Sequence, residues 1–413
     1  MQELLLYRNN ENKEVFDIMK KVAYGELKAD GEDSILIAKC ISHILEVSEK
    51  MGFKGNLWQD YIAYEISVNE NAFSLSCERK GRMEGSINKA ALYDCGILRK
   101  IFNTNIEETD FSLLLNFENN NEDERYFNKR IRNRIILLAE ELCNAESDEA
   151  FLNMICKFYG EVGVGKFGMF KAFRLNQNAE IEPVISVEHI RLNDLIGYEI
   201  QKKKLTDNTE SFLAGGKANN VLLFGDSGTG KSSSIKALLN EYYDAGLRMI
   251  EIYKHQFKEL SAVINTVKDR NYKFVIYMDD LSFEEFEIEY KYLKAVIEGG
   301  LEKKPDNVLI YATSNRRHLV REKYSDNEER DDDLHTRDTV QEKLSLSARF
   351  GVSIYYGSPN PREFKEIVKG LAKQNNISMP EDKLLAEANK WELSHGGLSG
   401  RCAKQFINYI TSI

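Results

Sequence analysis

Apolar residues recur at helical spacing through roughly the first 175 positions of the chain. Three stretches show this most clearly, and Ser34 could cap the first of them, which ends before Gly52. Because positions three and four apart share one face of a helix, each stretch is predicted to be an amphipathic helix whose stripe packs into a core. The stripes are Ile37, Ile41, Ile44 and Leu45; Phe127, Ile131, Ile135, Leu138 and Leu142; and Phe151, Met154, Ile155 and Phe158. Residues 70–78 are interpreted as a candidate strand.

The pattern changes in the second half of the chain, where short apolar runs alternate with helical segments. The runs cover residues 221–224, 249–253, 274–278, 308–312 and 352–356. Strands that helices cover on both faces are continuous apolar runs, so the alternation predicts a parallel α/β sheet with right-handed crossovers. From Pro361 the spacing is helical again, which predicts a small helical lid. Its apolar face carries Phe364, Ile367, Val368 and Leu371.

A polar stretch at residues 176–180, just before Pro183, is interpreted as the boundary between the two patterns. We therefore expect a mainly helical N-terminal domain over residues 1–180, an α/β subdomain over residues 181–358 and a helical lid over residues 359–413. The acidic run at residues 326–333 is interpreted as a solvated loop.

Charge and cysteine usage narrow the classes of protein that fit these patterns. The chain of 413 residues has a formal net charge of −10, which excludes a uniformly basic coat for nucleic acid but not a local patch. A cluster of Lys129, Arg130, Arg132 and Arg134 is interpreted as a solvated helix face, with contact to nucleic acid or an acidic partner as the alternative. The six cysteines form no CxxC pair, and no signal peptide or membrane-spanning run is found, so we expect a cytoplasmic protein without membrane contact.

A complete GxxxxGK[ST] motif lies between a strand-like run and a helical segment. Its glycines allow positive φ, so consecutive backbone N–H groups can turn toward phosphate oxygens, and the following helix adds the positive end of its dipole. Lys231 is expected to neutralise β- and γ-phosphate oxygens, and the Ser232 hydroxyl to ligate Mg²⁺. The candidate nucleotide-binding residues of the motif are Gly225, Asp226, Ser227, Gly228, Thr229, Gly230, Lys231 and Ser232.

Two carboxylates, Asp279 and Asp280, follow the apolar run at residues 274–278. A side chain at the carboxyl end of a parallel strand faces the crevice in which ligands bind. Asp279 is expected to hold Mg²⁺ through water, because this ion keeps much of its hydration shell. Asp280 is expected to orient or deprotonate the attacking water. Together the two motifs predict a site for ATP and Mg²⁺.

Four further segments resemble parts of the AAA+ superfamily of P-loop ATPases. Residues 307–316 resemble its sensor-1 strand, which implies that Asn315 lies between the γ-phosphate and the attacking water. Residues 344–351 resemble the arginine-finger segment, which makes Arg349 the candidate finger. Residues 397–401 resemble sensor 2, which implies that Arg401 reaches the phosphates from the lid. The segment of this chain that contains Ile196, Gly197 and Tyr198 is similar to the superfamily segment that covers the adenine.

More narrowly, residues 194–350 resemble a bacterial family of predicted ATPases known as domain of unknown function 815. The phrases that carry this resemblance begin at Leu195, Asp279, Ala312 and Glu342. The likeness is strong over the C-terminal half of the chain and weak over the N-terminal half. It implies an AAA+ fold and an ATP site, but it implies no substrate.

The resemblance also bears on assembly. An arginine finger that comes from a neighbouring subunit couples ATP hydrolysis to assembly, so we expect a homo-oligomer. Arg316 and Arg317 directly follow Asn315 and compete with Arg349 for this role.

Three patterns limit what the resemblance implies. Most AAA+ ATPases carry Asp-Glu where this chain carries Asp-Asp, and the shorter side chain of Asp280 predicts slow hydrolysis. The segment after residues 249–253 lacks the aromatic-apolar-Gly triplet of rings that thread polypeptides, which weighs against an unfoldase. Residues 163–168 match GxGxxG, but they follow a helical segment where a dinucleotide fold needs a strand, so we interpret them as a loop.

The sequence therefore predicts an ATPase that binds and slowly hydrolyses Mg·ATP to remodel or load a macromolecular complex. We expect the N-terminal domain to recognise that partner, whose identity the sequence does not indicate. The alternative is an ATP-gated assembly switch or scaffold with little motor activity. A nucleic-acid-handling ATPase is a third hypothesis, which the acidic net charge disfavours.

Overall fold

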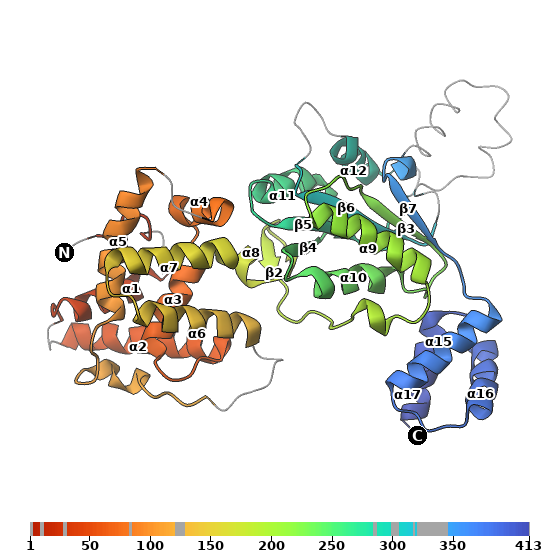
Figure 1. The fold of residues 1–413 in the computed structure, drawn as a ribbon, viewed down its shortest axis with the longest axis horizontal. Coiled ribbons are helices and arrows are strands. Elements are labelled where there is room, and N and C mark those ends of the chain that lie inside the picture. The colour runs from red at the N-terminus through yellow and green to blue at the C-terminus, as the bar shows by residue number, and fades with distance from the viewer. Residues whose placement is uncertain are drawn as a thin grey trace. The chain divides into compact units, whose positions relative to one another are not determined.

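The computed structural model divides the chain into two compact units, Met1–Phe170 and Lys171–Ile413 (Figure 1). It describes residues 3–8, 12–27, 31–81, 85–119, 129–283, 287–298, 305–316, 319 and 346–412. The predicted loop at residues 326–333, and Phe127 of the predicted second helix, lie outside the described residues.

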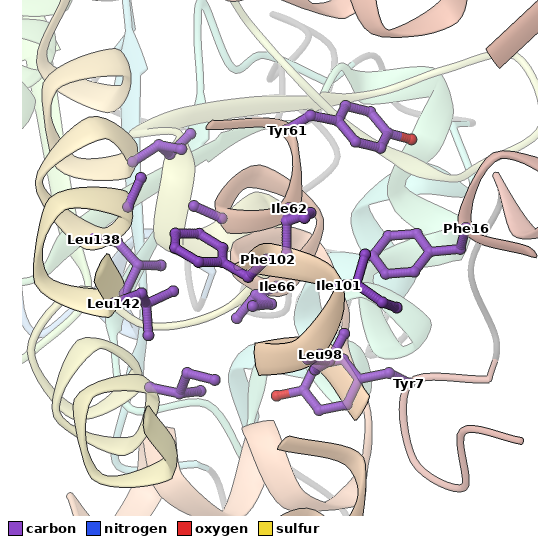
Figure 2. Packing of buried hydrophobic residues seen from close by; sticks show 14 of the residues in the cluster. Tyr7, Phe16, Tyr61, Ile62, Ile66, Leu98, Ile101, Phe102, Leu138 and Leu142 are labelled. Carbon is purple, nitrogen blue, oxygen red and sulfur yellow. The ribbon is translucent and has the colours of Figure 1, made fainter. Parts of the chain in front are cut away.

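The first unit is helical, as the spacing of its apolar residues predicts. Large aromatic side chains fill its core, and Figure 2 shows residues from α3, α5 and α6 gathered there with Tyr7 and Phe16. The elements are α1 (Lys13–Ala23), α2 (Gly31–Met51), α3 (Leu57–Val68), α4 (Ala72–Lys80), α5 (Ile87–Phe102), η1 (Asp110–Leu114), α6 (Lys129–Cys143), α7 (Asp148–Glu161) and α8 (Gly165–Met169).

The predicted strand at residues 70–78 is wrong, because this segment forms helix α4. Asn71 starts the helix with a capping box, in which its side chain accepts from the backbone of Ser74 and the Ser74 hydroxyl accepts from the backbone of Asn71. Phe73, Ser74, Cys77 and Glu78 are the buried positions and recur at spacings of three and four, as one face of a helix requires. The GxGxxG match at residues 163–168 follows α7 and not a strand, but the loop predicted there is wrong from Gly165 onward, where the five-residue helix α8 begins.

The second unit is built on a sheet whose strands, among the described residues, run in the order β2-β1-β4-β5-β6-β3-β7. Neighbouring strands are parallel except for the antiparallel pair β1 and β2. The strands are β1 (Ala172–Leu175), β2 (Ile181–Pro183), β3 (Val221–Gly225), β4 (Leu247–Glu251), β5 (Lys273–Met278), β6 (Val308–Ser314) and β7 (Val352–Tyr356). The structure thus confirms the predicted fold class of a parallel α/β sheet preceded by a helical region.

The polar stretch at residues 176–180 is the turn between β1 and β2. The side chain of Asn176 accepts from the backbone N–H groups of Asn178 and Glu180 at 2.9 and 3.0 Å, which closes the turn. The hairpin belongs to the second unit. This unit begins at Lys171, ten residues before residue 181, where the sequence predicts the start of the α/β subdomain. The division into three domains at residues 180 and 358 stays a prediction.

Helices cover both faces of the sheet, and β3, β4, β5 and β6 are buried on both sides as their apolar runs predict, whereas the edge strand β7 exposes Ser353 and Tyr355. Figure 1 shows α9 and α10 on one face and α11 and α12 on the other. The connecting elements are η2 (Leu192–Asp194), α9 (Glu199–Leu213), α10 (Lys231–Tyr242), η3 (Lys254–Glu259), α11 (Leu260–Val267) and α12 (Glu289–Glu298).

The predicted lid consists of α15 (Pro361–Gln374), α16 (Glu381–Ser394) and α17 (Gly400–Thr411). Asn360 and Glu363 form a capping box at the start of α15, with Pro361 in the first turn. The lid has a core of its own, in which Phe364 and Val368 of α15 meet Ala403 and Phe406 of α17.

No helix among the described residues is both long enough and apolar enough to cross a bilayer. The arrangement that matters for function is the strand order β5-β6-β3. Because β6 separates β3 from β5 and all three run parallel, their carboxyl ends lie side by side at one edge of the sheet. The glycine-rich loop follows β3, the two carboxylates follow β5 and Asn315 follows β6.

Candidate functional site

The glycine-rich loop has the backbone that its sequence predicts. Gly225, Gly228 and Gly230 have φ angles of +132°, +75° and +92°, which side chains rarely allow. Gly225 also has no room for a side chain, because a Cβ atom there would lie 2.1 Å from the carbonyl oxygen of Tyr356. The loop is thus fixed against β7 at its start and enters α10 at Lys231.

Asp226 ties this loop to the segment that leads into the lid. Its backbone N–H donates to the carbonyl of Tyr356 at 2.9 Å, and its carboxylate accepts from the backbone N–H of Ser358 at 2.7 Å. The hydrogen bonds from Ser358 lower the pKa of Asp226, so this carboxylate stays ionised. The loop, the end of β7 and the connection to α15 therefore form one hydrogen-bonded unit.

Lys231 lies inside the loop and is almost fully buried. Its ammonium donates to the carbonyls of Gly225 and Asp226 at 2.8 and 2.6 Å, and to the Oδ1 atom of Asn315 at 3.0 Å. Burial lowers the pKa of Lys231, while the nearby Asp226, Asp280 and Asp279 charges act in the opposite direction. The lysine therefore connects the phosphate loop directly to the end of β6.

Asp279 is the point at which the loop and β5 meet. Its Oδ1 atom accepts from the hydroxyl of Ser232 at 2.6 Å and from the hydroxyl of Thr313 at 2.6 Å. Burial raises the pKa of Asp279, but these hydrogen bonds, together with Tyr277 and the charge of Lys236, act in the opposite direction, and the pKa is lowered overall. An ionised carboxylate beside a hydroxyl is the pair of oxygen groups that a P-loop protein offers to Mg²⁺.

Asp280 adopts a left-handed backbone conformation with a φ of +49°. Its backbone N–H donates to the Thr313 hydroxyl at 2.9 Å, and its carboxylate accepts from the side-chain amide of Asn315 at 2.8 Å. Thr313 therefore fixes both carboxylates at once, through the side chain of Asp279 and the backbone of Asp280. Asn315 joins Asp280 to Lys231, which completes a continuous polar network across β3, β6 and β5.

These groups open into one cavity of about 650 Å³ between the sheet edge and the lid. This volume suits a small-molecule ligand. The loop, Asp279, Asp280 and Asn315 line its polar end, whereas an apolar part is lined by Ile196, Ile367, Leu371 and Ile407. Among the described residues, no group of three His, Cys, Asp or Glu side chains could hold a metal. A cation here would need further oxygens from a ligand, as Mg²⁺ takes from nucleotide phosphates.

The cavity brings together most of the residues that the sequence predicts for the site. Its lining includes Ile196, Gly197, Tyr198, Ser227, Gly228, Thr229, Gly230, Lys231, Ser232, Asp279, Asp280, Asn315 and Arg401. Gly225 and Asp226 form the base of the loop behind it. The backbone N–H of Arg401 donates to the carbonyl of Gly228 at 3.0 Å, which places the start of α17 directly against the loop.

The candidate arginine fingers lie elsewhere. Arg349 does not line the cavity and forms an ion pair with Glu298 at the end of α12. Arg316 is exposed just after β6, and Arg317 lies outside the described residues. The chain's own cavity therefore contains no described arginine from this group.

Three residues of the site were missed by sequence reasoning. Thr313 lies on β6 two positions before Asn315, which follows the strand, so the alternation of a strand indicates that both face the same side. Lys404 follows Arg401 by three positions on α17, which is again the same face of one helix. Lys202 on α9 is nearly buried and donates to the carbonyl of Leu195 at 2.8 Å, a contact across a turn that no motif signals.

Comparison with known proteins gives one family and a set of structures. The model of a family described as "Protein of unknown function (DUF815)" matches residues 168–412. No curated protein matches the chain. Similar solved structures include two variants of RuvB from Thermotoga maritima, which have TM-scores of 0.39 and 0.38 and identities of 16% and 17%. Each match covers 54% of this chain and 64% and 65% of those chains, which is less than two thirds of their length.

A third structure, titled as the Holliday junction branch migration motor RuvB of the same organism, has a TM-score of 0.33 and an identity of 14%. It matches 53% of this chain and 71% of its own.

Substituting Thr313→Val keeps the size of the side chain and removes the hydroxyl that fixes both carboxylates. We expect the Mg²⁺-dependent part of the affinity for ATP to fall about tenfold, with little change in metal-free binding. The pKa of Asp279 rises in the variant because one of the bonds that lowers it is lost. Its carboxylate then protonates at a higher pH, so affinity for Mg·ATP begins to fall at a higher pH on acidification. Calorimetry with and without Mg²⁺ measures both effects.

The matched control is Thr266→Val, which removes an exposed hydroxyl that bonds the carbonyl of Ala262 within α11. If the Mg²⁺-dependent part of the affinity for ATP changes equally in the two variants, Thr313 does not organise the carboxylates.

Proposed function

Since the chain belongs to the DUF815 family, whose model matches residues 168–412, we propose that its second unit is a P-loop ATPase that binds Mg·ATP and hydrolyses it slowly. The observation that supports this most directly is the 2.6 Å hydrogen bond between the Ser232 hydroxyl and Asp279. It joins the phosphate loop to the carboxylate at the end of a different strand, at the place where a nucleotide-bound Mg²⁺ needs oxygen ligands.

The cavity offers complementary groups along the whole length of a nucleotide. The loop amides and Lys231 suit the β- and γ-phosphates, and the apolar lining around Ile196 and Ile407 suits the base. Ser232 and, through water, Asp279 would hold Mg²⁺, which would supply positive charge to the phosphate oxygens. To receive the phosphates, Lys231 exchanges its bonds to the loop carbonyls and Asn315 for phosphate oxygens.

The groups around Asp280 explain why hydrolysis should be slow. Asp280 is the candidate base for the attacking water, but its short carboxylate already accepts from the amide of Asn315 at 2.8 Å. Its backbone N–H is also bonded to the Thr313 hydroxyl, which fixes the point from which the short side chain extends. A base must come within hydrogen-bond distance of the water, and both restraints oppose this.

The work that ATP performs is proposed to be the remodelling or loading of a macromolecular complex, with the helical first unit as the partner-binding part. After β4 the chain enters η3 and α11 directly, as predicted, and so the segment at residues 254–267 is helical where threading rings carry a pore loop. We place the protein in the cytoplasm as a homo-oligomer without membrane contact, and we do not favour nucleic acid as its partner.

A second candidate function, an ATP-gated assembly switch, is favoured by the bonds of the phosphate loop. The loop contacts β6 through Lys231 and Asn315, and it contacts the connection to the lid through Asp226 and Ser358. A nucleotide that displaces the first contact can therefore alter the second, whether or not the nucleotide is hydrolysed. In this candidate function hydrolysis only resets the assembled state.

The Asp280→Glu variant tests whether the length of the side chain at position 280 limits the rate of ATP hydrolysis. The additional methylene lets the carboxylate reach past Asn315, so we expect turnover to rise about tenfold with unchanged ATP affinity. Turnover is measured by phosphate release, and Asp280→Asn serves as the variant without a base. If Asp280→Glu turns over no faster than the wild type, the length of this side chain does not limit the rate.

Arg349 is proposed to complete the site of a neighbouring subunit. Arg349→Ala should leave ATP affinity unchanged and lower turnover by about three orders of magnitude, because guanidinium stabilises charge on the transferred phosphoryl group. Arg362→Ala, at an exposed arginine of α15, is the control, and Arg316→Ala tests the rival residue.

Mixing subunits shows whether Arg349 acts between chains. Lys231→Met lacks a working phosphate loop and Arg349→Ala lacks the finger, so each variant alone is inactive. A mixture contains interfaces at which an intact loop meets an intact Arg349, and it should regain part of the wild-type turnover. A mixture that stays inactive contradicts action between subunits.

A further inference from the structure

Helix α17 presents one row of polar side chains to the cavity. Arg401, Lys404 and Asn408 lie at spacings of three and four residues, and all three line the cavity. The opposite face of the helix is buried in the core of the lid through Cys402, Ala403 and Phe406. The orientation of the row is therefore fixed by packing and not by the polar side chains themselves.

The two ends of this row face different parts of the cavity. At the first turn, Arg401 lies against the phosphate loop, because its backbone N–H bonds the carbonyl of Gly228. Its positive charge also helps to lower the pKa of Lys231, although burial is the main cause. At the third turn, Ile407 lines the cavity together with Ile196 and Leu371. The helix thus runs from the polar end of the cavity to the apolar part.

Lys404 lies between these ends. A helix rises about 1.5 Å per residue, so Lys404 lies about 4.5 Å along the axis from Arg401. Its side chain is exposed to the cavity and forms no ion pair with any other described residue. An ammonium in this position has no role in holding the lid together, whereas the neighbouring Lys202 is paired with Glu199.

We propose that Lys404 is a nucleotide-binding residue that contacts the α-phosphate, whereas Arg401 acts at the γ-phosphate end. This inference rests on the proposed function, since it orients ATP with its terminal phosphates in the loop. A cation at the α-phosphate meets a group that ATP, ADP and AMP share. Lys404 therefore holds the nucleotide before and after hydrolysis, and of these two lid cations only Arg401 distinguishes ATP from ADP.

The test compares how two lid cations affect the binding of ATP and ADP. Lys404→Met should weaken ATP and ADP about equally, by about tenfold, which is the loss expected for one hydrogen bond to a charged group. Arg401→Met should weaken ATP more than ADP. Dissociation constants are measured by calorimetry at one fixed salt concentration, with adenosine as a ligand that has no phosphate and that Lys404→Met should bind unchanged.

Two further variants show whether the effect belongs to this position. Lys404→Arg keeps the positive charge and should restore most of the affinity for both nucleotides. Lys383→Met removes an exposed lysine of α16 that does not line the cavity, and it should bind both nucleotides like the wild type.

The outcomes separate this inference from the proposed function. If the wild type binds both nucleotides and Lys404→Met binds ADP equally well, Lys404 does not contact the α-phosphate although the ATP site stands. If Lys404→Met weakens the binding of ATP but not of ADP, Lys404 contacts the γ-phosphate instead, and the proposal is overturned. If the wild type binds neither nucleotide, the proposed function and this inference fail together.

Discussion

The hydrogen bond between Ser232 and Asp279 is the contact on which the site depends. It connects the first turn of α10 with the carboxyl end of β5 through two residues that are 47 positions apart in the sequence. The bond can form because β6 lies between β3 and β5 and all three strands are parallel, so that their ends are held at one edge of the sheet. A change of strand order would leave every motif intact and still separate the phosphate loop from its carboxylate.

Around this bond the structure builds a network in which each polar group has a defined partner. Thr313 supports both carboxylates, and Asn315 joins Asp280 to Lys231. Asp226 extends the network to the connection that leads into the lid. Buried polar groups are costly without partners, so a ligand that takes up Lys231 must compensate for the bonds that the lysine gives up. This requirement links nucleotide binding to the sheet and to the lid at the same time.

The parts that the sequence predicts well are those set by local pattern. Strands such as β5 are recognisable because helices on both faces require a continuous apolar run, and the glycines of the loop are recognisable because few other residues tolerate its φ angles. The strand expected at residues 70–78 is wrong because a short apolar run does not by itself separate helix from strand. The capping box at Asn71 and Ser74 was the available signal for helix.

The parts that the sequence does not predict depend on contacts between distant segments. Thr313 was missed because its role requires the register of β6 against β5, which places its hydroxyl beside Asp279. The hairpin turn at residues 176–180 was not predicted, because polar composition alone does not separate a linker from such a turn. Lys202 was missed because its hydrogen bond to the Leu195 carbonyl depends on how α9 is placed relative to the segment before it.

Calorimetric titration of the full chain with Mg·ATP tests the central claim most directly. We predict a saturable heat with one nucleotide bound per chain, and its loss in Lys231→Met at unchanged secondary structure by circular dichroism. A folded wild-type protein that gives no heat of association would contradict the account, as would a Lys231→Met variant that binds Mg·ATP as tightly as the wild type.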